Sequence, residues 1–380
     1  MTGPATTDVL EPGAGTPAPA GPGRPRWCLA TRILLAATLV WWLYLAAHLA
    51  LSGRYWLWVL PDAVPPLVFT VAPLLLAAAA GGLRLVSRPL PRIPRRLVLG
   101  GALLALVAGV PESGLNPGAL TGREPVPAGA IKVVSWNTQY WDQDDDPDRF
   151  YRYLLGLHAD VYLLQEYLNW DPADPGDEAR RVDDLARLRR EFPGWHIVAR
   201  GELITLSRFP IAAAPRVGPD RLPGADASFA AEYAAAKVLR TDLRIGGAVL
   251  STYNVHIPVQ FSVELRPELL ADTRKRTTAR AEQFAGLTGD VAANPGPVLV
   301  AGDFNTSPAM GDIRAVRRLL TDATPQLRSP YPVSWNLHGL PLWRLDWLFT
   351  GGGVRVHSYT ITGSEGLSDH HAQQTWVSLG

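Results

Sequence analysis

The sequence contains a single cysteine, Cys28. One thiol excludes an intrachain disulfide, and this cysteine usage fits an oxidising or a reducing compartment equally well. The sequence also lacks an internal repeat at the periods of solenoid or propeller proteins, so those architectures are excluded.

The part of the chain after Arg123 lacks an excess of basic residues. It holds 26 of the 36 Lys and Arg and 31 of the 35 Asp and Glu, a net charge of −5, whereas the first 123 residues carry a net +6. Proteins that grip long nucleic acids usually present a basic face, because phosphate contacts dominate their affinity. The charge therefore disfavours a dedicated nucleic-acid-binding protein, although a local basic groove stays open.

Long apolar runs are present, and all of them lie in the N-terminal third. Residues 1–31 are rich in Pro, Gly and Ala without a period, which predicts a disordered tail. Three apolar stretches follow, at about 32–51, 64–85 and 97–110. The first has the length of a bilayer span, the second contains prolines that membrane helices tolerate, and the third is short for crossing. We expect about three transmembrane helices within residues 32–110, with a re-entrant or interfacial helix as the alternative for the third.

The arginines predict an orientation for these helices. Basic residues precede the first stretch and cluster between the second and third, while only Arg54 lies in the loop between the first and second. The positive-inside tendency places the tail and the arginine-rich loop in the cytoplasm. Three crossings then make the chain a multi-pass protein of the cell membrane with an extracytoplasmic C-terminal domain, whereas two would leave that domain inside.

The rest of the chain alternates between strand and helix patterns. Residues 111–130 are rich in Gly and Pro and read as a linker, and residues 131–380 as a mixed α/β domain. Gly246 and Gly247 separate two apolar runs and predict a β-hairpin. Apolar residues at three- and four-residue intervals predict an amphipathic helix over 178–192.

Polar residues stand where several apolar runs end. In residues 298–308, VLVAGDFNTSP, a buried strand is followed by a tight turn that carries Asp303 and Asn305. Similar positions hold Asn137, Glu166, Asn254, His256, Asp346, Asp369 and His370. A carboxylate at the end of a buried strand is costly unless it is paired or bound to a metal, and Mg²⁺ prefers oxygen ligands. Glu166 is therefore the expected principal metal ligand.

Seven segments together resemble the endonuclease/exonuclease/phosphatase superfamily, the group of DNase I, apurinic endonucleases, inositol polyphosphate 5-phosphatases and neutral sphingomyelinases. In chain order they are residues 133–137 (VVSWN), 160–166 (DVYLLQE), 206–210 (LSRFP), 254–256 (NVH), 302–308 (GDFNTSP), 344–349 (RLDWLF) and 368–370 (SDH). The resemblance covers residues 131–379. It implies an α/β (α+β) fold, the DNase I-like four-layer sandwich of two mixed β-sheets flanked by helices.

The resemblance also implies roles for the polar residues. The expected metal site is Asn137 and Glu166, with Asp369 on the metal or its waters, and the ion is Mg²⁺ with Mn²⁺ as the alternative. Asp303 would activate water beside Asn305, and Asp346 would orient His370 toward phosphate. Asn254, His256 and Asn305 are the expected substrate-binding residues, and His256, Asp303, Asn305, Asp346 and His370 the expected catalytic set.

The sequence therefore predicts a membrane-anchored, metal-dependent phosphoesterase acting on a phosphorylated small molecule or lipid. Members of the superfamily with this three-span layout resemble a group associated with teicoplanin resistance, which suggests a phosphate or pyrophosphate on a membrane lipid carrier. A tethered extracytoplasmic nuclease and a non-catalytic binding module of the same fold stay open as alternatives. No obligate protein partner is evident.

Overall fold

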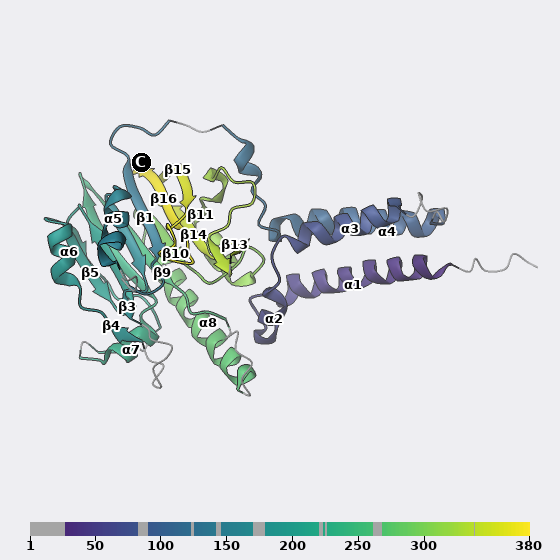
Figure 1. Cartoon of the computed structure of the whole chain (residues 1–380), viewed down its shortest axis with the longest axis horizontal. Helices are drawn as coiled ribbons and strands as arrows, with labels where there is room; N and C mark the ends of the chain where they lie inside the picture. The colour runs from purple at the N-terminus through teal and green to yellow at the C-terminus, as the bar shows by residue number, and fades with distance from the viewer. Residues whose placement is uncertain are drawn as a thin grey trace, which may run out of the picture.

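The computed structural model describes residues 27–82, 90–122, 125–141, 146–169, 179–219, 223–224, 226–260, 268–337 and 339–380. The expected tail, residues 1–31, lies outside this part of the chain except for its last five residues. Figure 1 shows two parts, a bundle of helices and a domain built on β-sheets.

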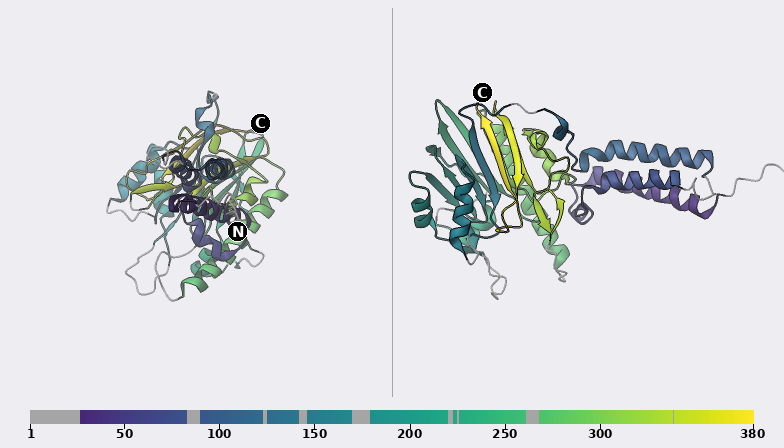
Figure 2. Two further views of the ribbon diagram at one scale, coloured as in Figure 1. Left: turned by 90° about the vertical axis from the view of Figure 1, so that its right-hand side faces the viewer. Right: turned by 45° about the horizontal axis from the view of Figure 1, so that its top comes forward.

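The bundle projects from one side of the domain. Helices α1 (Leu29–Leu51), α3 (Val68–Gly82) and α4 (Arg92–Gly109) run side by side, as the views in Figure 1 and Figure 2 agree. Apolar side chains cover much of its outer surface, among them Ile33, Leu39, Leu43, Leu75, Leu103 and Val107, each at least 60% exposed. Among the described residues, two helices, Leu29–Leu51 and Arg92–Glu112, are long and apolar enough to cross a membrane.

Among the described residues, the third apolar stretch forms a longer helix than the second, whereas the sequence predicts the opposite. The third is the longer helix, because Arg92 and the arginines after it form the first turns of α4. The second gives 15 helical residues among those described: α3 begins at Val68, after the prolines at 65 and 66, and the described residues stop at Gly82. The prediction of three crossing helices is therefore not confirmed.

Two six-stranded sheets form the domain. The first has the order β15 (Arg355–Thr362), β16 (Ala372–Ser378), β1 (Ile131–Asn137), β2 (Val161–Gln165), β6 (Leu203–Ser207) and β5 (His196–Arg200). The second has the order β11 (Thr321–Asp322), β14 (Asp346–Gly351), β10 (Val298–Asp303), β9 (Ala248–His256), β8 (Val238–Ile245) and β7 (Ile211–Ala213). The pairs β1–β2 and β9–β10 are parallel and the other pairs antiparallel, so both sheets are mixed, as predicted.

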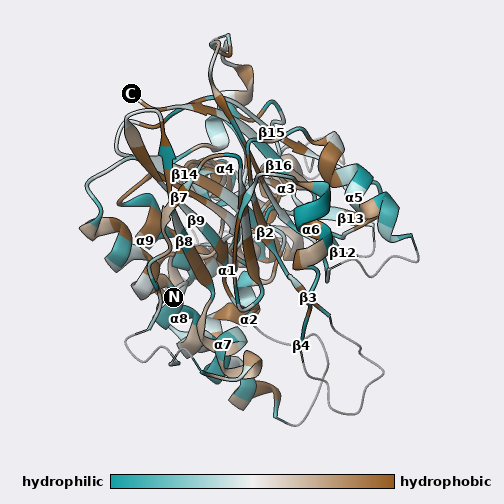
Figure 3. Cartoon of the chain, turned by 90° about the vertical axis from the view of Figure 1, so that its left-hand side faces the viewer, coloured by the Kyte–Doolittle hydropathy of each residue, from teal (hydrophilic) through white to brown (hydrophobic). Residues whose placement is uncertain are grey.

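The core lies in three layers because the strands alternate their side chains between two buried faces. Between the sheets pack Val133, Val161, Leu163, Leu250, Leu299 and Leu348. Helices α5 (Pro147–Gly156) and α6 (Leu185–Glu191) cover the outer face of the first sheet, and α8 (Leu269–Ala293) covers that of the second. In Figure 3 the strands are largely hydrophobic, while α5 and α6 in front of them also carry hydrophilic residues. The predicted sandwich of two mixed sheets flanked by helices is confirmed.

Shorter elements complete the chain. They are α2 (Val59–Asp62), α7 (Phe229–Ala235), α9 (Arg314–Arg317), the 3₁₀ turns η1 (Trp56–Trp58), η2 (Val110–Glu112), η3 (Pro117–Leu120), η4 (Gly311–Ile313) and η5 (Thr324–Gln326), and the two-stranded pairs β3 (Leu168–Asn169) with β4 (Arg180–Arg181) and β12 (Trp335–Leu337) with β13 (Leu340–Trp343).

The bundle and the domain meet at the loop that follows β10. Ser52, at the end of α1, accepts a hydrogen bond on Oγ from the Gly311 backbone N–H (2.8 Å) and donates one to Asp62 Oδ2 (2.6 Å). Ala309 packs against Leu45 and other apolar side chains of the bundle. The segment that follows Asp303 and Asn305 is therefore held by the head of the helical bundle.

Replacing Gly311 by Ala is expected to destabilise this junction. An added Cβ would lie 2.0 Å from the carbonyl oxygen of Ser52, so one backbone segment must move. Overpacking of this kind costs about 1–3 kcal/mol, measurable by thermal unfolding of the full chain in detergent. Gly247→Ala is the matched control, since its Cβ would meet no atom within 4 Å. Equal losses in the two variants would contradict the tight contact.

Candidate active site

Glu166 stands at the end of β2, in a turn that fixes the direction of its side chain. Its φ is +62°, a left-handed backbone that non-glycine residues seldom adopt. The carboxylate accepts from Asn137 Nδ2 on Oε1 (3.0 Å) and from the Tyr140 backbone N–H on Oε2 (3.0 Å). Burial raises the pKa of Glu166, as expected for a carboxylate removed from water.

Asp303 ends β10 in the other sheet and is 1% exposed. Its Oδ1 accepts from the Asn305 backbone N–H (2.7 Å), and its Oδ2 accepts from Asn137 Nδ2 (3.1 Å) and Asn305 Nδ2 (3.3 Å). Burial also raises the pKa of Asp303. Asn137 thus joins Glu166 of one sheet to Asp303 of the other, and four residues predicted from the sequence lie together.

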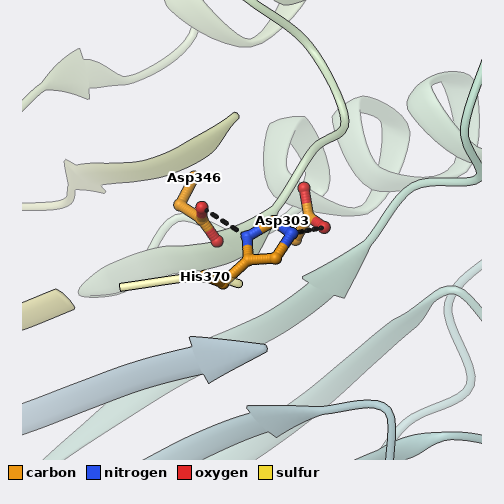
Figure 4. A group of neighbouring side chains, drawn as sticks. All are labelled: Asp303, Asp346 and His370. Carbon is orange, nitrogen blue, oxygen red and sulfur yellow. Dashed lines mark hydrogen bonds and ion pairs between the residues drawn. The ribbon is translucent and has the colours of Figure 1, made fainter. Parts of the chain in front are cut away.

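A histidine bridges Asp303 to a second aspartate, as Figure 4 shows. His370 Nδ1 lies 2.9 Å from Asp346 Oδ2, and its Nε2 lies 3.5 Å from Asp303 Oδ2. Burial alone would lower the pKa of His370, but Asp346, Asp303 and Asp369 outweigh it and raise the pKa to about 10. The ring is therefore an imidazolium at neutral pH, oriented by Asp346.

A second histidine approaches Asp303 from β9. His256 Nδ1 lies 3.0 Å from Glu202 Oε2, and its Nε2 lies 3.6 Å from Asp303 Oδ2 and 3.9 Å from Glu166 Oε1. Burial opposes its protonation, yet the carboxylates around it raise the pKa of His256 to about 9. Two cationic rings, each backed by a carboxylate, thus direct Nε2 at the same oxygen of Asp303.

Glu202 and Lys237 are site residues that the sequence analysis missed. Glu202 is fully buried and forms ion pairs with Lys237 and His256, while the Lys237 ammonium lies 3.6 Å from the ring centroid of Tyr233. Burial alone would raise the pKa of Glu202, but His256 and Lys237 lower it to about 2. The only sequence signal for Glu202 was its position as an acid just before the apolar run LITL. The other site residues stand where an apolar run ends, whereas Glu202 stands where one starts.

The structure does not bring Asn254 into this cluster. Its Nδ2 donates to the backbone oxygens of Leu164 (2.8 Å) and Ile204 (3.0 Å), and its Oδ1 accepts from Gln165 Nε2 (2.6 Å). Asn254 is 0% exposed and lies two residues before His256 on β9, where its hydrogen bonds connect the two sheets. As placed, its amide is engaged by these groups, and its contact with substrate stays a prediction.

Asp369 lies at the edge of the cluster. Its Oδ2 accepts from Trp335 Nε1 (2.8 Å), and its backbone N–H donates to Gln139 Oε1 (2.8 Å). It acts on the cluster through charge, as one of the acids that raise the pKa of His370. As placed, its carboxylate is directed to β12 and not to the Glu166–Asn137 pair.

Oxygen-bearing side chains converge where a hard divalent cation would fit. Carboxylate oxygens of Glu166 and Asp303 both lie within 3.1 Å of the terminal amide of Asn137. As placed, Asn137 Oδ1 accepts from the Gln139 backbone N–H (3.0 Å), so Asn137 would offer its oxygen to a cation only with its amide turned over. Asp303, Asp346 and His370 place ligand atoms within 4.8 Å of one another, but the two carboxylates occupy both ring nitrogens. Glu166 beside Asn137 therefore stays the expected cation site.

Comparison with known proteins decides the family. The model of the endonuclease/exonuclease/phosphatase family matches residues 134–370. The chain belongs to this family. Members of the endonuclease/exonuclease/phosphatase family hydrolyse phosphodiester bonds and generally depend on a divalent metal. Comparison with curated proteins gives no match.

Solved structures of the family are similar over the domain. The family protein from Beutenbergia cavernae is 18% identical, with a TM-score of 0.47, and the match covers 66% of this chain and 72% of that one. The family protein from Leptotrichia buccalis is 14% identical, with a TM-score of 0.46 and coverage of 66% and 100%. The human Nocturnin catalytic domain with bound sulfate is 16% identical, with a TM-score of 0.44 and coverage of 68% and 98%.

Replacing Glu202 by Gln is expected to lower the free energy of unfolding by about 3–5 kcal/mol, because it leaves the Lys237 and His256 cations buried without their carboxylate. The depressed pKa of Glu202, about 2 against an ordinary 4.5, contributes stability above pH 4.5 that is lost as pH falls toward 2. The raised pKa of His256 contributes stability below pH 6.5 that is lost as pH rises through 9.

The difference between wild type and Glu202→Gln should therefore be largest between pH 4.5 and 6.5 and shrink on both sides. Denaturant unfolding at several pH values measures it. Glu282→Gln, at an exposed position of α8, is the control. A difference that does not vary with pH would contradict the buried ion-pair network.

Proposed function

We propose that the chain is a membrane-anchored, divalent-metal-dependent phosphoesterase with its catalytic domain outside the cytoplasm. One observation carries the proposal: two cationic histidines converge on Asp303 Oδ2, at 3.5 and 3.6 Å, beside the Asn137–Glu166 pair. A buried carboxylate, two hydrogen-bond donors of positive charge and a cation site are the groups that attack of water on phosphorus requires.

Each group has a task that follows from its contacts. Asp303, held by Asn305 and Asn137, accepts the proton of the attacking water, and its raised pKa makes it a stronger base. His256 and His370 donate from Nε2 to the phosphoryl oxygens as negative charge grows there. Glu166 and Asn137 would hold Mg²⁺ or Mn²⁺, which neutralises charge on the phosphate when bound.

Two observations support the membrane anchor. Helices α1 and α4 are long and apolar enough to cross a bilayer, and the bundle exposes large apolar side chains. Basic residues flank the first apolar stretch on its N-terminal side and precede the third, which favours an extracytoplasmic domain when three segments cross.

A lipid carrier with a phosphate or pyrophosphate group is the substrate that this arrangement favours. A substrate confined to the membrane meets a tethered site at a raised effective concentration. The layout resembles that of the group associated with teicoplanin resistance, and the net charge of −5 after Arg123 disfavours DNA.

Phosphate release from lipid pyrophosphates, inositol phosphates, sphingomyelin and plasmid DNA tests the proposal, with the full chain in detergent. We expect release from a lipid pyrophosphate with Mg²⁺ or Mn²⁺, and none after EDTA treatment. Glu166→Gln should raise the metal concentration for half-maximal rate at least tenfold, while Glu282→Gln should not. Cleavage of DNA alone would favour a tethered nuclease, and no hydrolysis with either metal would favour a non-catalytic module.

A further inference from the structure

A cavity of about 510 Å³ lies at the junction of the bundle and the domain, away from the active site. It is lined by the loop that follows α1, by one face of α8 and by residues 310–318 of the domain. Figure 1 shows α2 and α8 near each other at the head of the bundle, where the apolar part of α1 ends. A cavity in this position opens at the level expected for lipid headgroups.

The positive charge available in this cavity belongs to two arginines. Arg280 is occupied by Thr306 (2.7 Å) and Asp312 (2.8 Å), and Arg314 by Glu112 (3.3 Å). Arg54 and Arg318 have exposed side chains, and within the described part of the chain neither forms an ion pair with an acid. Arg54 Nη1 donates one long hydrogen bond to the Ala50 backbone oxygen (3.4 Å), so both guanidinium groups keep donors and an unneutralised charge for an anion.

The rest of the lining is mixed: its two acids are paired within the protein, Asp62 with Ser52 and His48 and Asp312 with Arg280, and apolar side chains lie on two sides. Trp56 and Val59 contribute from the side of the bundle, and Ala281, Phe284 and Ala285 from α8. Tyr55 is 48% exposed beside them, and Trp and Tyr are the side chains that favour the membrane interface. A ligand with an anionic head and an apolar body matches both walls, whereas a free phosphate matches only the arginines.

We propose that this cavity binds an anionic phospholipid of the bilayer, with its phosphate between Arg54 and Arg318 and the start of an acyl chain against Trp56 and Phe284. The inference rests on the proposed membrane anchor. The floor of the cavity is Met310, Gly311 and Asp312, in the segment that follows Asp303 and Asn305. A bound lipid would therefore stabilise the contact between the helical bundle and the loop that follows the catalytic carboxylate.

Lipid retention by the full chain tests this site. The protein is purified in detergent with equal amounts of phosphatidylglycerol and phosphatidylcholine, and native mass spectrometry counts the lipids bound per chain. We expect one phosphatidylglycerol to be retained in preference to phosphatidylcholine. The double variant Arg54→Gln/Arg318→Gln should bind it about 25-fold more weakly, since each basic residue near a membrane surface contributes roughly fivefold.

The control removes two arginines elsewhere. Arg189→Gln/Arg244→Gln changes exposed positions of α6 and β8 and should retain the lipid like wild type. Equal retention of both lipids, or equal loss in both double variants, would overturn the proposal. Displacement of the lipid by millimolar inorganic phosphate would assign the site to a free anion instead. The membrane anchor is tested independently of the lipid site, by whether the chain resists alkaline extraction from membranes.

Discussion

Replacing Asp303 by Asn is expected to lower the rate of phosphate release by about 10²–10⁴, the range in which a general base contributes. The amide keeps the size of the side chain and can still meet the Asn305 backbone N–H, so the fold should persist. It cannot accept a proton from water, and it removes the negative charge on which the Nε2 atoms of His256 and His370 converge. The loss should therefore appear in kcat more than in KM.

The matched control for this prediction is Asp183→Asn, which makes the same chemical change at an exposed position. Circular dichroism and thermal unfolding confirm that both variants are folded. A folded Asp303→Asn variant that retains more than a tenth of the wild-type rate would assign the proton transfer to another group.

The positions of the site residues could be predicted because each buried strand stops at a polar side chain. Asn137 and Glu166 end neighbouring parallel strands of one sheet, and His256 and Asp303 end neighbouring parallel strands of the other. Parallel neighbours must bring their carboxyl ends to the same edge, so each pair follows from local patterns. That the two edges face each other across the sandwich came only from the resemblance to the family.

Two features of the site could not be predicted from a sequence pattern. They are how deeply Asn254 is buried and which distant residue pairs with Glu202. Because side chains alternate along a strand, Asn254 and His256 point to the same face of β9. At Asn254, two residues before His256, the opposite sheet covers that face. Glu202 immediately precedes β6, and its partner Lys237 is 35 residues away. Nothing local marks such a pair.

Helix boundaries were the least predictable part of the fold. The amphipathic pattern over 178–192 predicts one helix, but α6 begins only at Leu185, because Arg180 and Arg181 pair as a short strand with Leu168 and Asn169. The predicted hairpin at Gly246 and Gly247 is confirmed, with Ile245 opposite Ala248. A two-residue turn is a local signal, whereas the end of a helix depends on what the neighbouring chain can pair with.

Asp346→Asn and His370→Ala are each expected to lower kcat by about 10²–10⁴, and the double variant by little more than either alone. Asp346 acts through His370: it accepts from Nδ1 at 2.9 Å, which turns Nε2 toward Asp303, and it is the strongest cause of the raised pKa of the ring. Without the carboxylate the pKa of His370 falls below its wild-type value of about 10, although Asp303 and Asp369 still raise it, so the rate of Asp346→Asn should decline at a lower pH than that of wild type. Wild type should hold its rate to higher pH, because its imidazolium persists to about pH 10.

A double-mutant cycle over these variants separates a coupled pair from two independent groups. His196→Ala, at an exposed position of β5, is the control for loss of a histidine and should leave the rate unchanged. If the two losses multiply in the double variant, Asp346 has a role that does not pass through His370. If the pH profile of Asp346→Asn matches that of wild type, the ring does not need its charge. Only the second result would replace the imidazolium donor with a neutral one. A loss smaller than the product, together with a shifted profile, would support His370 as a cation that Asp346 orients toward the phosphate.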